Sequence, residues 1–281
     1  MEAAFFDLDK TVVSKSSSLA LTRPFYRAGL VTRSQLLKGA YAQLVYLMLG
    51  ADQRRMDRAK AGMLAVTTGW DKQEIEDLVR EVLEEVIDPY IYQEALDLIA
   101  LHKALGRKVF IVSSSPEEVV KPLAERLGVD EVIGTRAETE DGKYTGVLEF
   151  YCYGEDKAAR IREIAEQENL DLSESFAYSD SVTDRPMLES VGNPVAVNPD
   201  RELRRLAEQR GWRIRDFRRP VRLRQRFADV PRPTPRAILV GAIALAMLIV
   251  WMYLRPRRQA RRAEADRPTI RRLVPSIRRA A

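Results

Sequence analysis

Short apolar runs alternate with amphipathic segments along most of the chain. The unbroken runs at residues 3–6, 108–113 and 175–179 have the length of strands that are covered on both faces, as in a parallel sheet. Shorter runs at 194–197 and 212–214 predict edge strands, and residues 129–149 predict short strands around an Asp141-Gly142 turn. Helical patterns at 91–105, from Ser114 onward, at 154–169 and at 200–210 lie between these runs. This alternation of strands and helices along the chain predicts an α/β fold with a doubly wound, Rossmann-like parallel sheet.

A block of helical pattern separates the first two apolar runs. After a polar stretch at 14–18, apolar residues recur with helical spacing at 34–49, 53–66 and 71–87, and Asp71 is a candidate N-cap. Because this insert follows the first strand directly, we expect residues 14–88 to form a small helical cap over the carboxyl end of that strand. The catalytic core is then expected at 1–13 and 89–216. Residues 41–49 are apolar nearly all round, which predicts burial within the cap or a lining for an apolar substrate.

Composition narrows the chemistry that this chain can perform. The only cysteine, Cys152, excludes an intramolecular disulfide. The only histidine, His102, lies in a helical stretch where we expect a surface position. Histidine-rich metal sites and Ser-His-Asp catalysis are therefore disfavoured, which leaves carboxylates and lysine as the reactive groups.

The charge of the chain is strongly asymmetric. The net charge is +5, but residues 213–281 hold 19 Arg, no Lys and 4 acidic residues, so their net charge is +15 and that of residues 1–212 is −10. Residues 217–236 are rich in Arg and Pro and are expected to form a linker without a core. Residues 255–281 are expected to form a basic, disordered tail. Nucleic-acid binding by this Arg-rich region is the rival interpretation, but no recognisable nucleic-acid motif accompanies it.

Residues 237–254 predict a transmembrane helix. These 18 residues carry no charge and would span about 27 Å as a helix, close to the thickness of a bilayer core. Trp251 and Tyr253 lie near one end, as interfacial aromatic residues do. The basic flanks are expected to lie against anionic headgroups. Since a strand begins two residues into the chain and leaves no room for a signal peptide, we expect a single-pass membrane protein whose catalytic domain is cytoplasmic.

Reactive side chains follow the predicted strands at their carboxyl ends, where open α/β sheets bind ligands. Asp7 and Asp9 follow the first strand and would point the same way if the strand continued that far. Such a pair can hold a divalent cation, or divide the roles of nucleophile and general acid. The hydroxyls of residues 113–115 form an anion site or an ordinary helix cap. Lys157 opposes the helix macrodipole, so it is a surface residue or is held to meet an anion.

The ordered set resembles the four motifs of the haloacid dehalogenase (HAD) superfamily. The motifs are Asp7-Leu8-Asp9-Lys10-Thr11, then Ser113, then Lys157, and finally Asp180 with Asp184, and the resemblance covers residues 3–215. The position of the helical insert is similar to that in subfamily IB, the phosphoserine-phosphatase-like branch.

This resemblance implies a role for each residue. Asp7 would be the nucleophile that forms an aspartyl-phosphate, and Asp9 the general acid and base. Thr11, Ser113 and Lys157 would bind the phosphate. Mg²⁺ would be held by Asp7, the main-chain carbonyl of Asp9 and Asp180, with Asp184 supporting from nearby. A carboxylate needs such cations to approach an anionic phosphate.

Two departures from the family pattern bear on the substrate. Ser16 stands where serine phosphatases of this branch carry a Glu that recognises the amine of the substrate, and Ser179, Ser181 and Thr183 replace residues of the usual fourth motif. We therefore expect a membrane-tethered, Mg²⁺-dependent phosphatase that acts on a phosphorylated small molecule or a lipid phosphate. Phosphoserine phosphatase is the alternative within the enzyme class. A catalytically inactive, membrane-bound scaffold with a HAD fold is the alternative outside it.

Overall fold

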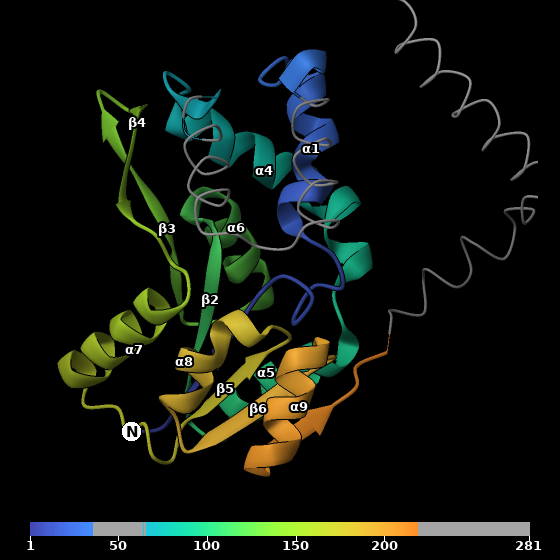
Figure 1. The fold of residues 1–281 in the computed structure, drawn as a ribbon. Coiled ribbons are helices and arrows are strands. Elements are labelled where there is room, and N and C mark those ends of the chain that lie inside the picture. Colours follow the sequence, from blue (N-terminus) through green and yellow to red (C-terminus); the bar gives the residue numbers. More distant parts are fainter. Residues whose placement is uncertain (36–63, 65, 219–281) are drawn as a thin grey trace, which may run out of the picture. The chain divides into compact units, whose positions relative to one another are not determined.

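A computed structural model describes residues 1–35, 64 and 66–218 (Figure 1). Within these residues, seven strands form one sheet in the order β4-β3-β2-β1-β5-β6-β7. All neighbouring strands are parallel except β3 and β4. The strands are β1 (Ala3–Phe6), β2 (Lys108–Pro116), β3 (Glu131–Glu140), β4 (Lys143–Phe150), β5 (Phe176–Ser179), β6 (Asn193–Val197) and β7 (Arg213–Arg215).

Helices cover both faces of this sheet, which confirms the predicted α/β fold. In Figure 1, α7, α8 and α9 lie in front of the sheet and α5 and α6 behind it. The helical segments are α1 (Ser17–Arg27), α4 (Lys72–Val86), η1 (Asp88–Tyr90), α5 (Gln93–Ala104), α6 (Glu117–Leu127), α7 (Glu155–Glu168), η2 (Val182–Asp184), α8 (Arg185–Glu189) and α9 (Arg201–Arg210). The predicted cap of α4 is confirmed, because the carboxylate of Asp71 accepts hydrogen bonds from the N–H groups of Gln73 and Glu74.

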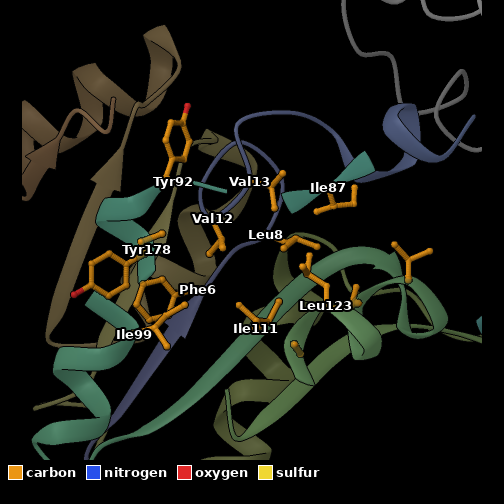
Figure 2. Close-up of a cluster of buried hydrophobic side chains, with 14 of the residues drawn as sticks. Phe6, Leu8, Val12, Val13, Ile87, Tyr92, Ile99, Ile111, Leu123 and Tyr178 are labelled. Atoms are coloured by element: carbon orange, nitrogen blue, oxygen red, sulfur yellow. The ribbon is translucent and has the colours of Figure 1, made fainter. Parts of the chain in front are cut away.

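The central strand β1 supplies the core on both faces of the sheet. Phe5 stacks on Phe110 with ring centroids 5.0 Å apart, and Phe6 stacks on Tyr178 at 4.3 Å. Because successive strand residues point to opposite faces, these two pairs belong to two separate hydrophobic clusters. Figure 2 shows the cluster around Phe6, where Leu8 also packs. Burial on both faces explains why the first apolar run lacks polar residues.

Strand β2 is longer than the sequence indicates. We expected the strand to end at Ser113 and a helix to begin in the following Ser-Ser-Pro segment, but β2 continues to Pro116 and α6 begins at Glu117. The cause is local, since proline disfavours the helical conformation in the residue before it. Ser115 is therefore held extended, and Pro116 itself has ψ 144°.

The second half of the sheet also differs from the prediction at its edges. Strand β6 is not an edge strand, because it pairs with β5 on one side and with β7 on the other. Strands β3 and β4 form a long hairpin rather than short strands. Its turn is the predicted Asp141-Gly142 pair, and both residues have positive φ, 50° and 78°.

The described part of the insert contains a helix, α1, that we did not predict from the sequence. Helix α1 begins inside the polar stretch, whereas the predicted helix at 71–87 is confirmed as α4. The predicted helices at 34–49 and 53–66 lie almost wholly outside the described residues, as does the apolar segment 41–49.

His102 is not a surface residue, as we had expected. It is 2% exposed and its Nε2 lies 2.8 Å from the hydroxyl of Tyr178. Burial, together with the nearby charge of Arg107, lowers its pKa to about 4. The neutral ring is thus part of the core, packed edge-on against Phe6.

The compact part of the chain continues into the predicted linker. Phe217 is buried against Tyr92 with ring centroids 5.7 Å apart, and the N–H of Arg218 donates to Glu94. The predicted transmembrane segment 237–254 and the basic tail 255–281 lie outside the described residues. No helix in the described ranges has the length and apolar character needed to cross a bilayer.

Candidate active site

The site lies where β1, β2 and β5 end side by side. Asp7 follows β1, and its N–H donates to the carbonyl of Tyr178 in β5 at 2.9 Å. We had considered that the first strand could continue to Asp9, but β1 ends at Phe6. The chain turns back instead, because Lys10 adopts a positive φ of 63° and the N–H groups of Val12 and Val13 both donate to the carbonyl of Leu8. This turn, rather than strand alternation, sets the positions of the two aspartates.

Lys157 joins the first motif to the last. It is 2% exposed in the first turn of α7, and its Nζ donates to Asp7 Oδ1 at 2.8 Å and to the carboxylate of Asp184 at 2.9 Å. Ser179 donates to the same carboxylate at 2.8 Å. The structure therefore decides between the two interpretations of Lys157. It is a buried cation in a site of carboxylates, not a surface residue.

Burial and mutual repulsion shift the pKa values of the charged groups around Lys157. Burial raises the pKa of Asp7 well above its usual value, and repulsion from Asp184 and Asp180 adds to this, while Lys157 acts against it. Burial also raises the pKa of Asp180 to about 6, against the opposing charge of Lys10 and with a smaller contribution from the repulsion of Asp184. Burial alone would lower the pKa of Lys157, but the attraction of Asp7 and Asp184 raises it. Lys157 thus contacts Asp7 and Asp184 while the charge of Lys10 acts on Asp180, and a bound cation would further stabilise the ionised forms of these carboxylates.

Asp9 occupies a different environment, beside the start of α1. The N–H of Ser17, at the start of α1, donates to Asp9 Oδ1 at 2.9 Å, and the side chain of Ser16 also hydrogen-bonds to this carboxylate. Burial raises the pKa of Asp9 despite these bonds. Since Lys157 contacts Asp7 and not Asp9, the two carboxylates have distinct surroundings, which suits them to different roles.

Two of the hydroxyls in the predicted motifs lie buried at this edge of the sheet. Thr11 is fully buried and its hydroxyl has no hydrogen-bond partner among the described residues. Ser113 is also buried, and its Oγ accepts a hydrogen bond from the N–H of Ser115 at 3.1 Å. Buried polar groups are normally paired, so the hydroxyl of Thr11 is unusual in having no partner among the described residues.

The replacements in the fourth motif keep it ordered. Ser179 binds Asp184 as described, and the hydroxyls of Ser181 and Thr183 lie 3.0 Å apart. Asp200 adds a support that we did not predict. Its N–H donates to the carbonyl of Asp180 at 2.8 Å, and its carboxylate accepts from the N–H of Val182. Its position as the first residue of the predicted helix at 200–210 was the available signal.

Ser17 is a further residue that sequence reasoning missed, and Ser115 was considered only as one of three hydroxyls of an anion site or helix cap. Their hydroxyls lie 3.0 Å apart, so the start of α1 is joined to the end of β2 directly beside Asp9 and Ser113. Both residues stand in runs of serine, and nothing in those runs distinguishes one hydroxyl from the next.

The side chains at this edge are compatible with a magnesium ion. In the described part of the chain, no group of three or more His, Cys, Asp or Glu side chains has the arrangement of a metal site. Mg²⁺, however, is usually held by one or two carboxylates, and water and phosphate oxygens complete its coordination. Asp7 and Asp180 provide two carboxylates, and the excess negative charge around Lys157 favours a cation.

Comparison with known proteins decides the family. A family model described as haloacid dehalogenase-like hydrolase matches residues 4–189. The chain belongs to this family. A 52% identical relative, the inhibition of morphological differentiation protein of Streptomyces azureus, covers 91% of this chain and 94% of its own length. A probable phosphatase of Mycobacterium tuberculosis is 49% identical, over 87% of this chain and 85% of the relative.

A more distant relative and the solved structures agree with this assignment. A phosphoserine phosphatase of Mycobacterium tuberculosis is 36% identical over 88% of this chain and 79% of its own length. A protein of unknown function from Bordetella pertussis, 29% identical, superposes with a TM-score of 0.69 over 76% of this chain and 98% of that chain. The structure of a phospho-aspartyl intermediate analogue of a phosphoserine phosphatase, 18% identical, shares the fold. Its TM-score is 0.55, over 80% of this chain and 98% of that chain. The enzyme is a HAD-family phosphoric monoester hydrolase.

Proposed function

We propose that this enzyme hydrolyses a phosphate monoester through an aspartyl-phosphate on Asp7. The observation that carries the proposal is the buried ammonium group of Lys157 between Asp7 and Asp184. A carboxylate can attack an anionic phosphate only where positive charge offsets their repulsion. Lys157 supplies one such charge at 2.8 Å from the attacking group.

The first chemical step forms the covalent intermediate. A carboxylate oxygen of Asp7 attacks phosphorus, a new phosphorus–oxygen bond forms, and the bond to the ester oxygen breaks. The leaving alkoxide takes the proton of Asp9, whose raised pKa favours the protonated form that this step needs. Thr11 and Ser113 donate hydrogen bonds to the phosphate oxygens, which orients the group for attack.

The second step restores the enzyme. Asp9, now ionised, removes a proton from water, and the water oxygen attacks phosphorus. The bond between phosphorus and Asp7 breaks, and inorganic phosphate leaves. The residues that would hold Mg²⁺ are Asp7, the main-chain carbonyl of Asp9 and Asp180, with Asp184 in support. When bound, this ion offsets the charge of the phosphate and polarises a phosphoryl oxygen.

The substrate that we propose is a phosphorylated small molecule or lipid, with phosphoserine as the second candidate. The relative named phosphoserine phosphatase supports the second candidate. Against it, Ser16 carries no charge to pair with an amine, and its side chain is engaged with Asp9. The lipid candidate rests on the apolar segment 237–254, through which we propose that the enzyme is tethered to a membrane with its catalytic domain on the cytoplasmic side.

The replacement Asp7→Asn tests the chemistry. We expect divalent-cation-dependent hydrolysis by the wild type and none by the variant, together with phosphate incorporation from a labelled substrate into the wild type alone. The control is Asp156→Asn, which changes an exposed aspartate of α7 and should leave both measurements unaltered. Full activity of Asp7→Asn would refute the proposal. Lack of activity in the wild type on every ester would favour the inactive scaffold.

A substrate panel and a membrane assay test the remaining parts. Detergent-solubilised enzyme should prefer a lipid phosphate to phosphoserine, and a strong preference for a small soluble ester over every lipid phosphate would exclude the lipid substrate. The full chain should remain in the membrane fraction after carbonate extraction. The double variant Leu245→Arg/Leu248→Arg should be released, since charges within a span are costly. Release of the wild type would exclude a transmembrane tether.

A further inference from the structure

The start of α1 departs from an ordinary helix cap. Ser16 has the extended backbone of a cap residue, yet its side chain makes no capping hydrogen bond within the helix. A serine in this place normally accepts a hydrogen bond from an N–H group two or three residues further on. Here the side chain of Ser16 bonds to the carboxylate of Asp9, and the N–H of Ser17 donates to Asp9 Oδ1 at 2.9 Å. The first N–H group of α1 is therefore satisfied by the carboxylate of the proposed proton donor.

This contact restrains the carboxyl group of Asp9. In a protonated carboxyl group one oxygen is the donor, and the other keeps its capacity to accept. Because Oδ1 accepts the hydrogen bond from Ser17, the arrangement favours Oδ2 as the oxygen that carries the proton. A general acid works only within hydrogen-bond reach of the atom that it protonates. The position of Ser17 therefore bears directly on the transfer of this proton.

A second hydrogen bond holds Ser17 against the core of the enzyme. Ser17 is fully buried, and its hydroxyl oxygen lies 3.0 Å from that of Ser115, which is 4% exposed near the end of β2. The N–H of Ser115 donates to Ser113 Oγ at 3.1 Å. A path of hydrogen-bonded residues thus runs from Asp9 through Ser17 and Ser115 to Ser113, which we propose for phosphate binding.

Burial makes the link between the two serines costly to break. If Ser115 is replaced by alanine, the hydroxyl of Ser17 loses the partner that β2 provides, and an unpaired buried polar group is unfavourable. The side chain of Ser17 then turns to another partner, or the first turn of α1 shifts. Either change alters the hydrogen bonds that the N–H and hydroxyl of Ser17 make to Asp9. The main-chain bond from residue 115 to Ser113 is kept, because the N–H group remains.

We propose that Ser115 is a positioning residue for proton transfer from Asp9. Through its hydroxyl it holds Ser17 at the start of α1, and Ser17 in turn holds the carboxyl group of Asp9 toward the ester oxygen of the substrate. This inference rests on the proposed function, since it concerns the proton that leaves Asp9 in the first step. Loss of the Ser115 hydroxyl should therefore slow the departure of leaving groups that need a proton and spare those that do not.

Values of kcat/KM across a series of phosphate monoesters test this proposal. In the two-step reaction, kcat/KM includes only the steps up to release of the leaving group, so it isolates the step in which Asp9 donates its proton. The series runs from p-nitrophenyl phosphate, whose leaving group needs no proton, through phenyl phosphate to alkyl phosphates. The variants are Ser115→Ala, Ser17→Ala and the double variant. The control is Ser18→Ala, which removes an exposed hydroxyl from the same turn of α1.

We expect Ser115→Ala to lower kcat/KM about tenfold on alkyl phosphates and less than about twofold on p-nitrophenyl phosphate. A tenfold loss corresponds to about 1.4 kcal/mol, the scale of one buried hydrogen bond. Because both serines act through one bond, the double variant should be no slower than Ser17→Ala alone. The control Ser18→Ala should match the wild type on every ester.

Equal losses on all esters would overturn the proposal, because they would indicate general damage to the fold. Losses that add in the double variant would overturn it as well, since the two serines would then act independently. If Asp9→Asn is selectively slow on alkyl phosphates while Ser115→Ala behaves as the wild type, this inference fails and the proposed function stands. No hydrolysis of any ester by the wild type would refute the proposed function itself, and this inference with it.

Discussion

Replacing Lys157 by methionine should destabilise the protein and abolish its activity. Methionine has a similar length but no charge, so the carboxylates of Asp7 and Asp184 lose the ammonium group that lies 2.8 and 2.9 Å away. Removing one partner of a buried ion pair costs about 3–5 kcal/mol, since the other charge stays buried. For a domain of this size, each kcal/mol lowers Tm by about 2–4 °C, so Tm should fall by at least about 6 °C.

The pH dependence of this loss identifies its cause. Asp7 already has a raised pKa through burial, and loss of Lys157 raises it further. A carboxyl group whose pKa is higher in the folded state than in the unfolded state destabilises the fold above its unfolded pKa. That cost is relieved as the pH falls through the folded pKa. The deficit of Lys157→Met should therefore be smaller at pH 5 than at pH 7.5.

Thermal melts at the two pH values and steady-state kinetics measure these effects. We expect kcat to fall by at least about 10²-fold, as it does when a group that stabilises transition-state charge is removed. Adding Asp184→Asn should recover part of the stability without restoring activity. The control Arg162→Met removes an exposed pair with Glu155 on the same helix and should cost less than about 1 kcal/mol. An unchanged Tm, or a deficit that does not depend on pH, would show that the buried charge balance is not what Lys157 maintains.

Three further predictions concern the proton donor, the buried histidine and the metal. Asp9→Asn should slow the first step by about 10²–10⁴-fold on alkyl phosphates but far less on p-nitrophenyl phosphate, whose leaving group needs no proton, so p-nitrophenolate should appear in a burst before the slowed second step, and equal losses of the first-step rate on both substrates would contradict the role of Asp9. His102 has a folded pKa of about 4 against 6.5 when unfolded, so stability present above pH 6.5 should decline by up to about 3 kcal/mol as the pH approaches 4. Denaturant melts of His102→Gln should show a flatter profile in that window. Removing divalent cations should abolish hydrolysis, and restoring Mg²⁺ at a hundred times its Kd should raise the free energy of unfolding by about 2.7 kcal/mol. A Tm that does not respond to Mg²⁺ would contradict binding at this site.

The sequence was most informative where apolar runs end. Strands β1 and β5 are unbroken apolar segments, so the polar residues after them, Asp7 and Asp180, could be assigned to one edge of a parallel sheet. The pairing of β1 with β5 then brings these residues together, whatever the sequence separation. The position of Lys157 in the first turn of a helix left a surface position and an anion-binding role both open, and only the family resemblance chose between them.

The errors have local physical causes. His102 was assigned to the surface by residue type, yet it follows Ala95, Leu98 and Ile99 with the spacing of one helical face, and all four are buried. Strand β2 was ended three residues early, because a Ser-Ser-Pro segment was taken as a helix start although proline holds the residue before it extended. The beginning of α1 could not be predicted from polar residues alone, since its first N–H is satisfied by Asp9, a contact of the folded chain.

The charge balance of the site explains why its parts depend on one another. The repulsion among Asp7, Asp180 and Asp184 adds to the cost of burying them ionised, and although Lys157 and Lys10 oppose this, the pKa values of Asp7 and Asp180 remain raised. A phosphate ester would bring additional negative charge to the same place. Binding is therefore favourable only if further positive charge and hydrogen-bond donors are added, and we propose the unpaired hydroxyl of Thr11 as one such donor. We therefore expect the folded protein to be less stable when the site is empty. The proposed cation would stabilise it by neutralising the carboxylates, and the substrate by accepting hydrogen bonds from unpaired donors.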